Sequence, residues 1–366
     1  MTGRLHNTLA AERERLGWSQ TRMAEAAGIS RQSYAAIESG ASVPSTEVAL
    51  RLSLALGHPV SHLFHLPDRP AERRVAVWSG SDAPALGHRI RLTRVAGRWI
   101  AHPCAELHRP EASGDGVVER VNRGEVGVRL LPDRHPLASL AAVGCDPAFG
   151  MLVDGLRRDH GIEVSWSQRG SGAALATLAR GEAHVAGVHL HDAESGTWNG
   201  PWVRRTVPFP CTRISFATWE QGLLVRPDAR HRIGGIGDLG GGQLRLLNRE
   251  QGSGSRALLD EELIAAGVET AQVEGYATAA RGHLAVAAAV AAGAADAGVA
   301  IRAASVSYGL EFLPLRQEAY ELVIPDHFLD LPAVQALLGL LGRPAVRAQV
   351  EALGGYDVAI MGRVAS

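Results

Sequence analysis

Apolar and polar positions in residues 1–66 recur with the 3.6-residue period of amphipathic helices, and serine precedes three of the periodic runs. Serine hydroxyls cap helix N-termini, and Gly28 followed by Ile29 turns the chain between two of the runs. The predicted helices are Leu5 to Leu16, the run capped by Ser19 that ends at Ala26, the run capped by Ser30 that reaches Ser39, the run from Pro44-Ser45 to Leu56, and a last turn from Val60 to Phe64. This pattern predicts a compact five-helix module.

Residues 67–137 have a different pattern. Short alternating pieces, HRIRLTRVAG, RWIAH and EVGVRLLP, are separated by Pro, Gly and Asp residues. A period of two is typical of strands that bury one face. We therefore predict a small β-rich connector over this region.

Residues 138–366 alternate between strand-like and helical runs. The strand-like runs are SLAAVGC, IEVSW, AHVAGVHL, QLRLLN, AGVAI and LEFLPL, and the helical runs are AFGMLVDGLRRDH, GAALATLARG, SRALLDEELIAAG and HLAVAAAVAAG. Such alternation favours a parallel α/β sheet with crossover helices. The runs ISFATWEQGLLV and EAYELVIP could each pass between two lobes, so we expect a two-lobed α/β clamp.

Composition sets limits on the partners. A chain of 366 residues is long enough for two or three domains, and its formal net charge of -1 makes any DNA contact a local patch. Three widely spaced cysteines without a CxxC pair indicate neither a zinc site nor a disulfide framework. The N-terminus lacks an apolar signal region, and the alanine-rich run Leu284–Ile301 contains Asp296 and two glycines. We expect a cytoplasmic protein with no membrane partner.

The segment WSQTRMAEAAGISRQSYAAIESG has the physical features of a helix-turn-helix. Its second helix buries Met23 and Ala24 against the third, Gly28 allows the tight turn, and Ile29 fills the core between them. Side chains at the start of the third helix can read base edges in a major groove. The residues expected to be exposed there are Arg31, Gln32, Ser33 and Tyr34.

This segment resembles the phage-repressor-like helix-turn-helix family, also called the xenobiotic response element (XRE) family, over roughly sixty residues. The resemblance rests on Ser19-Gln20, Ala24, Gly28, Ile29-Ser30, Ile37-Glu38-Ser39-Gly40 and Pro44-Ser45. It implies a homodimer on a pseudo-palindromic double-stranded DNA operator, with Gln20 and Ser30 joining Arg31, Gln32, Ser33 and Tyr34 as DNA-contact candidates. It also implies that Gln20 braces the third helix and that Glu38 is structural, while Ala41 stands where relatives often have a basic residue. The alternative is a helical bundle for protein contacts only.

Two glycine- and serine-rich loops precede helical runs. Gly170-Ser171-Gly172 stands before AALATLARG, and Gly252-Ser253-Gly254-Ser255-Arg256 stands before ALLDEEL. A helix start leaves backbone N–H groups unpaired, glycine lets a ligand approach them, and serine adds donors. Two such loops facing across a cleft would suit a small oxyanion, whereas each alone could be an ordinary helix cap. No GxxxxGK loop and no GxSxG motif occurs.

Residues 138 to about 356 resemble the periplasmic-binding-protein-like domain of molybdate-binding proteins and of repressors that fuse it to this type of helix-turn-helix. The motifs are Gly144-Cys145-Asp146-Pro147, Gly170-Ser171-Gly172, LARGEAHVAGVHLHD, Trp219-Glu220-Gln221-Gly222, NREQGSGSRALLD, GYATAARGHLAVAAAVAAGAADAGVAI and LEFLPLRQEAYELVIP. The resemblance implies a two-lobed, type II sensor domain that binds a small effector, molybdate or another oxyanion, and needs no further cofactor.

The effector's chemistry depends on Asp146. Molybdate receptors have a serine-type donor after the first strand, where this chain has Cys145 followed by Asp146, and Gly282 replaces another frequent hydroxyl. A carboxylate in the cleft would repel a dianion, unless it caps the helix after Pro147. If Asp146 faces the cleft, the pocket suits an amine-bearing or neutral organic ligand.

Two histidines complete the candidate effector site. His189, His191 and Asp192 form an HxHD cluster without an evident third metal ligand, so His189 is expected to donate to the ligand, as is His283 at another helix start. Trp219 and Tyr320 could form a hinge or a cleft wall. No nucleophile, base and orienting group emerge from the spacing, so an enzyme is the alternative of a different class. The full set of effector candidates is Cys145, Asp146, Ser171, Gly172, His189, Gly252, Ser253, Gly254, Ser255, Arg256 and His283.

Overall fold

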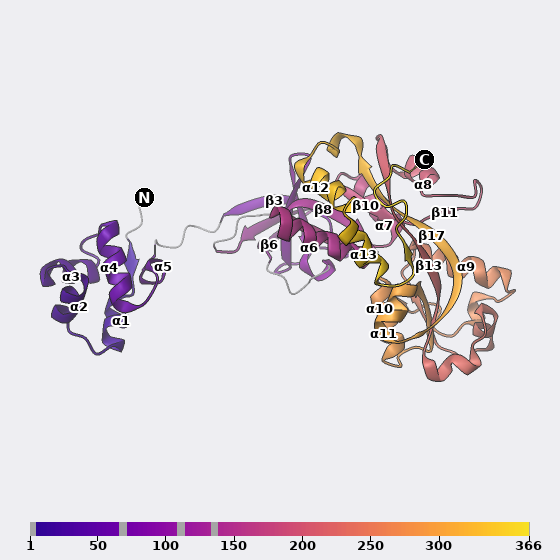
Figure 1. Ribbon diagram of the computed structural model, residues 1–366, viewed down its shortest axis with the longest axis horizontal. Coiled ribbons are helices and arrows are strands. Elements are labelled where there is room, and N and C mark those ends of the chain that lie inside the picture. Colours follow the sequence, from indigo (N-terminus) through magenta and orange to yellow (C-terminus); the bar gives the residue numbers. More distant parts are fainter. Residues whose placement is uncertain (1–4, 66–71, 108–113, 133–137, 366) are drawn as a thin grey trace. The chain divides into compact units, whose positions relative to one another are not determined.

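A computed structural model describes residues 5–65, 72–107, 114–132 and 138–365 (Figure 1). The chain divides into two compact units, residues 1–72 and residues 73–366. Within the described residues, no helix has the length and apolar character needed to cross a bilayer.

The N-terminal unit contains the five predicted helices. They are α1 (Leu9–Arg15), α2 (Gln20–Ala27), α3 (Arg31–Glu38), α4 (Thr46–Leu56) and α5 (Val60–Leu63). The first helix begins at Leu9 instead of Leu5 because β1 (His6–Asn7) pairs antiparallel with β2 (Phe64–His65). Side chains of Ser19, Ser30 and Ser45 accept backbone N–H groups and cap α2, α3 and α4. The three caps fix where these helices start.

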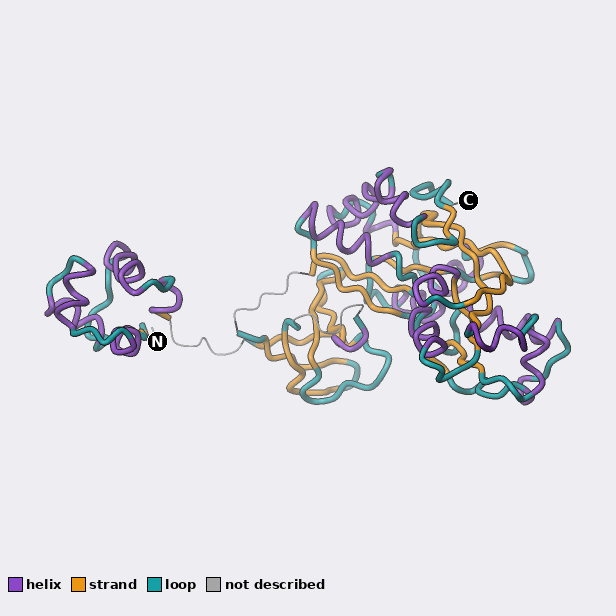
Figure 2. The backbone as a smooth tube through the Cα atoms, turned by 60° about the horizontal axis from the view of Figure 1, so that its bottom comes forward, coloured by secondary structure: helices purple, strands orange, loops and turns teal. Residues whose placement is uncertain are grey.

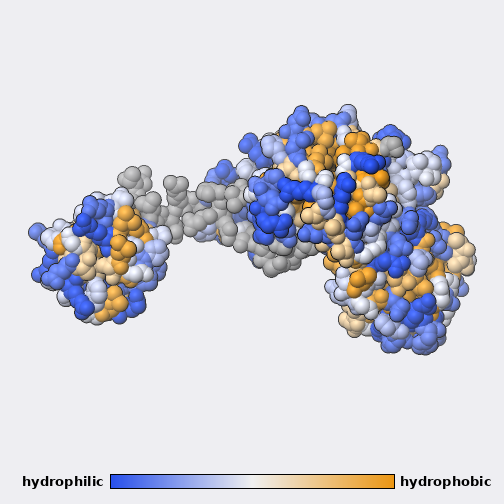
Figure 3. Space-filling view, viewed as in Figure 1, coloured by the Kyte–Doolittle hydropathy of each residue, from blue (hydrophilic) through white to orange (hydrophobic). Residues whose placement is uncertain are grey.

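The core of this unit is formed by apolar side chains on the inward faces of the helices. Leu9, Met23, Leu52 and Leu63 are fully buried. Gly28 ends α2 with a φ of 67°, a left-handed conformation that favours glycine and lets the chain turn into α3. Apolar side chains also reach the surface of the unit (Figure 3), and Val43, Leu50 and Leu54 are among those that are exposed.

The predicted β-rich connector contains five strands, and it lies in the same compact unit as the α/β part. They are β3 (Arg73–Trp78), β4 (Arg89–Val95), β5 (Arg98–Pro103), β6 (Gly116–Asn122) and β7 (Glu125–Leu130), with a 3-10 turn over Cys104–Glu106. Pairing is antiparallel except between β3 and β5. Ile90, Leu92 and Val126 form part of its core. Strand β4 also pairs in parallel with the first strand of the α/β part, Thr93 opposite Ala138, so the connector and the α/β part share one sheet.

The remaining chain forms a two-lobed α/β fold, as the alternation predicted (Figure 2). The first lobe has β8 (Ala138–Gly144), β9 (Glu163–Gln168) and β10 (Val185–Val188) in parallel, with α6 (Phe149–His160), α7 (Ser171–Ala179), α8 (Gly200–Thr206), α12 (Pro332–Leu341), α13 (Pro344–Glu351) and the short strands β11 (His191–Asp192), β12 (Thr197–Trp198) and β18 (Tyr356–Asp357). The second has β14 (Leu246–Arg249), β15 (Ala279–Ala280) and β16 (Ala297–Ile301) in parallel, with α9 (Gly254–Ala265), α10 (His283–Ala291) and α11 (Arg302–Tyr308).

Two long strands join the lobes. β13 (Cys211–Val225) and β17 (Glu311–Pro325) pair antiparallel over their whole length. β17 pairs with β10 of the first lobe, and β13 pairs with β16 of the second. The prediction that these two segments pass between the lobes is confirmed, and they bring buried polar side chains to the junction.

Candidate functional site

Four helices begin at the junction of the lobes, each at the carboxyl end of a parallel strand or just after it. Cys145 follows β8, Ser171 begins α7 after β9, Ser255 lies in the first turn of α9 after β14, and His283 begins α10 after β15; all four are buried. In open α/β sheets this edge is where ligands bind. The helix starts also direct backbone N–H groups and the positive ends of the helix dipoles toward it.

The two glycine-serine loops touch each other. Gly172 N donates a hydrogen bond to Gly252 O at 3.2 Å across the junction. A Cβ on Gly170 would lie 3.0 Å from Ser253 Cβ, and a Cβ on Gly254 would lie 2.5 Å from His189 Cε1. Glycine is therefore required here for close approach of the two lobes. The two glycine-serine loops, which the sequence pattern suggested would face each other, are therefore in direct contact.

A buried chain of polar groups runs along the first lobe and the joining strands. Cys145 Sγ lies 3.2 Å from His189 Nε2, and His189 Nδ1 lies 2.7 Å from Glu318 Oε2. Gln221 Nε2 also donates to this carboxylate, at 2.6 Å. Burial alone would lower the pKa of His189, but Cys145 and Glu318 outweigh it and raise the pKa to about 10. His189 is therefore charged and directs N–H groups at both of its neighbours.

Arg249 is the buried positively charged side chain that the second lobe contributes to the junction. Its side chain is fully buried, it pairs with Glu250 at 2.8 Å, and its Nη1 lies 3.0 Å from His283 Nδ1. A guanidinium can only donate, so His283 Nδ1 must accept and Nε2 carries the hydrogen. Burial, followed by Arg249 and His189, holds the pKa of His283 well below its usual value, so the ring is neutral. Its Nε2 finds no partner among the described residues, which leaves a buried N–H donor unused.

Asp146 is engaged in the turn that leads into α6. Its Oδ1 accepts hydrogen bonds from Ala148 N at 2.9 Å and from Tyr356 Oη at 2.6 Å. Burial raises the pKa of Asp146 to about 6, against the opposing effect of these two hydrogen bonds. Oδ2 has no partner among the described residues. One oxygen thus stabilises the turn before α6, whose N-cap residue is Ala148, and the other oxygen stays available.

The other sequence candidates lie around this cluster in different roles. Ser171 Oγ accepts from His189 N at 3.0 Å, whereas Ser253 Oγ caps α9 and donates to Glu250 O at 2.8 Å. Arg256 pairs with Asp260 at 3.1 Å, and its guanidinium stacks on Tyr276. Of the HxHD motif, Asp192 pairs with Arg205 outside the cluster. Sequence reasoning missed Arg249, Glu318 and Gln221 as site residues, because both joining strands carry several other polar residues from which the last two do not stand out.

The hydrogen-bond roles also bear on metal binding. Cys145, His189 and His283 each place a ligand-type atom within 4.8 Å of the others, and thiolate with imidazole would suit zinc. A metal at His283 Nε2 would require the hydrogen on Nδ1, where it would face the Arg249 donor 3.0 Å away. The cluster therefore favours a ligand that accepts hydrogen bonds over a cation.

The DNA-contact residues predicted for the N-terminal unit lie mainly at the start of α3. Ser30 Oγ caps this helix by accepting from Ser33 N at 3.0 Å, and Arg31, Gln32 and Ser33 are exposed. The prediction that Tyr34 is exposed was wrong. Its side chain is fully buried and donates to Glu38 Oε1 at 3.0 Å, because helical spacing places it on the same inward face as Ile37.

Gln20 and Glu38 hold α2, α3 and α1 together. Gln20 Nε2 donates to Glu38 Oε2 at 2.6 Å, and Arg13 Nε donates to Glu38 Oε1 at 2.7 Å. Burial would raise the pKa of Glu38, but hydrogen bonds from Arg13, Gln20 and Tyr34 outweigh it and lower the pKa. The amide of Gln20 thus braces the third helix through Glu38.

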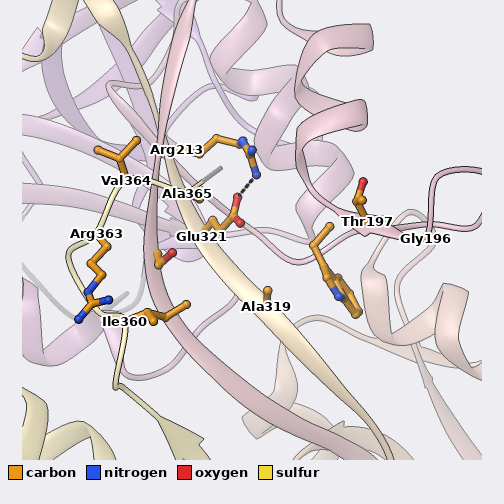
Figure 4. Close-up of a pocket in the computed structure, with 11 residues that line it drawn as sticks. Gly196, Thr197, Arg213, Ala319, Glu321, Ile360, Arg363, Val364 and Ala365 are labelled. Atoms are coloured by element: carbon orange, nitrogen blue, oxygen red, sulfur yellow. Dashed lines mark hydrogen bonds and ion pairs between the residues drawn. The ribbon is translucent and has the colours of Figure 1, made fainter.

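A separate surface hollow of about 470 Å³ lies beside the joining strands of the first lobe (Figure 4). Arg213 Nη1 and Glu321 Oε2 point toward one another across it at 2.8 Å, so their charges compensate. Ile360, Arg363 and Val364 line its other side. The junction of the lobes, with an unused buried donor, is the stronger candidate for a small polar ligand.

Two family profiles match the chain. The profile described as a helix-turn-helix covers residues 9–63, and the profile of the PBP superfamily domain covers residues 153–342. The chain therefore belongs to the PBP superfamily and carries an N-terminal helix-turn-helix domain. Both resemblances seen in the sequence, to XRE-type helix-turn-helix and to periplasmic-binding-protein-like domains, are confirmed.

Curated relatives match parts of the chain. The uncharacterised protein YvgK of Bacillus subtilis is 34% identical over 197 residues, 54% of this chain and 63% of that protein, so less than two thirds of YvgK is covered. The uncharacterised HTH-type transcriptional regulator YgzD of B. subtilis is 36% identical over 64 residues, 18% of this chain and 97% of its own length. An uncharacterised protein in the ferredoxin 2Fe-2S gene 5' region of Clostridium pasteurianum is 32% identical over 108 residues, 29% of this chain and 96% of that protein.

Solved structures with a similar fold include transport receptors. A putative phosphate-binding receptor with bound phosphate from Clostridium perfringens has a TM-score of 0.43 and 13% identity, covering 60% of this chain and 98% of its own. The tungstate ABC transporter protein of Geobacter sulfurreducens has a TM-score of 0.43 and 15% identity, covering 57% and 95%. Scores this low carry no argument about the ligand.

Proposed function

We propose that the protein is a cytoplasmic transcriptional regulator whose PBP-type domain binds a small oxyanion between its lobes, and whose closure changes DNA affinity. The observation that carries this proposal is the buried N–H of His283 Nε2, left unused where the two glycine-serine loops meet. An acceptor-only ligand would satisfy this donor and the backbone N–H groups of the helix starts. An enzyme that uses the clamp is the alternative of another class.

The charges near the junction favour a small anion held mainly by hydrogen bonds. Arg249 is fully buried and shares its charge with Glu250, while His189 shares its charge with Glu318. The main obstacle is Asp146, since a dianion and an ionised carboxylate about 5 Å apart repel by roughly 7 kcal/mol at an effective dielectric near 20. Its hydrogen bonds with Ala148 and Tyr356 support a role in the turn. Molybdate is one oxyanion of this kind.

An amine-bearing or neutral organic effector is the second candidate. The observation that favours it is Asp146 Oδ2, a buried carboxylate oxygen without a partner among the described residues. An ammonium or hydroxyl donor would satisfy this oxygen, whereas an oxyanion would not.

Asp146→Asn separates these two effectors. We expect the native protein to bind one of molybdate, tungstate, phosphate or sulfate, and the variant to bind it no better, because Asp146 serves the turn. The free energy of unfolding should fall by about 1 kcal/mol, the typical net value of one hydrogen bond, because the amide weakens the contacts with Ala148 and Tyr356. Asp192→Asn, which changes a carboxylate outside the cluster, is the matched control for calorimetry and thermal melts.

If the native protein binds no oxyanion while an amine or neutral metabolite stabilises it, the oxyanion proposal is wrong. Oxyanion binding that appears only in Asp146→Asn would also count against it.

The DNA contacts make a separate prediction. Arg31→Ala and Gln32→Ala should each cost about 1–3 kcal/mol on the operator and relax its sequence preference, because both side chains are exposed at the start of α3. Arg123→Ala, on an exposed turn of the β-rich connector, should leave operator affinity unchanged. Electrophoretic shifts on operator and scrambled DNA give the comparison. Equal losses on both DNAs would mean that the side chains contact only phosphates.

We further propose that the regulator is a homodimer on a two-fold symmetric operator. The exposed apolar side chains of Leu50 and Leu54 on α4, with Val43 before it, offer a surface for a second copy. Half-sites should lie about one helical turn of DNA apart. A footprint without two-fold character would argue against the dimer.

A further inference from the structure

A carboxylate and two imidazoles converge on the surface of the helix-turn-helix unit. Glu12, on α1, places Oε2 3.1 Å from His58 Nε2 and Oε1 3.3 Å from His62 Nε2, and the two histidines flank the start of α5. One ligand-type atom of each residue lies within 4.8 Å of the other two. Neither the lobe junction nor the exposed start of α3 includes these residues.

The two oxygen–nitrogen separations, one from each carboxylate oxygen of Glu12, are close to the edge length of a tetrahedral zinc site. Bonds of 2.0–2.1 Å from zinc to imidazole nitrogen and carboxylate oxygen imply about 3.3 Å between neighbouring ligand atoms. We propose that Glu12, His58 and His62 bind a divalent cation of the zinc type, with water at the fourth position. This proposal is independent of the effector assigned to the C-terminal domain.

The backbone holds both histidines in place before any metal binds. His58 N donates to Ser53 O at 3.2 Å, and Ser53 Oγ donates to His58 O at 2.5 Å. Thr8 Oγ1 donates to His62 O at 3.0 Å. The two rings stack with centroids 4.5 Å apart. Ligands that are already oriented lose less conformational entropy on binding, which favours a stable complex.

Arg15 contacts two of the three proposed ligands in the structure. Its Nε donates to Glu12 Oε2 at 2.7 Å and its Nη2 lies 3.1 Å from His58 Nε2. The Arg15 side chain is 57% exposed at the end of α1, so a cation can displace it into solvent. Arg15 therefore competes with the metal and does not block the site permanently.

Metal binding would join α1 to α5, the first and last helices of the unit. The same two regions are also connected by the pairing of β1 with β2 and by hydrogen bonds from Thr8 to the carbonyl oxygens of His62 and Leu63. A cation bound only to the folded unit stabilises it by mass action. We expect zinc to protect this end of the unit against opening.

Zinc titration of the full-length protein tests the proposal. We expect a stoichiometric complex in which His58→Ala and His62→Ala each lower zinc affinity at least about 10-fold, since even partners outside the ligand set commonly matter by that factor. Arg15→Ala should raise the affinity several-fold by removing the competitor, a gain that a purely structural network would not produce. His160→Ala removes an exposed histidine at the end of α6 and should have no effect.

The second cysteine- and histidine-containing cluster requires its own control. His283→Asn should leave zinc affinity unchanged, and Co²⁺ bound to the native protein should show ligand-field bands without the sulfur-to-cobalt charge transfer that Cys145 would cause. The proposal is overturned if the native protein binds no zinc, if affinity falls only in His283→Asn, or if Arg15→Ala and both histidine variants bind zinc as the native protein does.

Discussion

Replacing Arg249 by glutamine is expected to weaken binding of the oxyanion effector roughly 30-fold or more, because truncating one partner of a buried, hydrogen-bonded charge pair costs about 2–5 kcal/mol. Arg249 is fully buried and fixes the tautomer of His283 through a 3.0 Å contact. Without it, His283 can place its hydrogen on Nδ1, and the Nε2 donor is lost along with the charge. Calorimetry with the oxyanion that binds the native protein gives the measurement.

Arg256→Gln is the matched control for Arg249. Both arginines flank the same loop, but Arg256 is only partly buried, pairs with Asp260 and stacks on Tyr276. We expect this variant to bind the effector within a factor of a few of the native protein. Circular dichroism and operator binding must stay native in Arg249→Gln, so that lost affinity is not lost folding. Similar losses in both variants would show that the loop acts through general positive charge.

Replacing Glu38 by glutamine is expected to lower the free energy of unfolding of the N-terminal unit by about 3 kcal/mol, because a buried pair that loses one partner leaves the other charge uncompensated. The Glu38 side chain is 8% exposed and accepts hydrogen bonds from Arg13, Gln20 and Tyr34. Glu47→Gln, which breaks an exposed pair with Arg51, should change stability by less than about 1 kcal/mol. Hydrogen exchange of residues 5–65 in the full-length protein reports the difference.

The pH dependence of this effect has a definite sign. The pKa of Glu38 is lowered in the folded protein, so its contribution is complete above the unfolded pKa of about 4.3 and is lost as pH falls through the folded pKa. The difference in free energy of unfolding between the native protein and Glu38→Gln should therefore become smaller as the pH falls. A difference that is constant from neutral pH to strong acid would mean that packing, not charge, accounts for the loss.

The sequence by itself determined the elements and their class. Apolar spacing predicted the five helices, serine predicted the caps of α2, α3 and α4, and alternation predicted the parallel sheets and the two joining strands. These features are local, since period and cap chemistry act over a few residues. The loops at Ser171 and Ser253 were also found from local pattern. Tyr34 was misplaced because its inward direction depends on where α3 packs against its neighbours.

Only the tertiary structure decided the chemistry of the site. His189 meets Cys145 from 44 positions away and Glu318 from 129, and Arg249 meets His283 from 34. Whether a histidine donates or accepts is set by such a partner, because an imidazole can do either. Neighbouring strands bring these partners together, and no spacing in the chain encodes which ring nitrogen keeps its hydrogen. The unused donor of His283 thus follows from packing of strands and helix starts, and not from the glycine-serine pattern that marked the place.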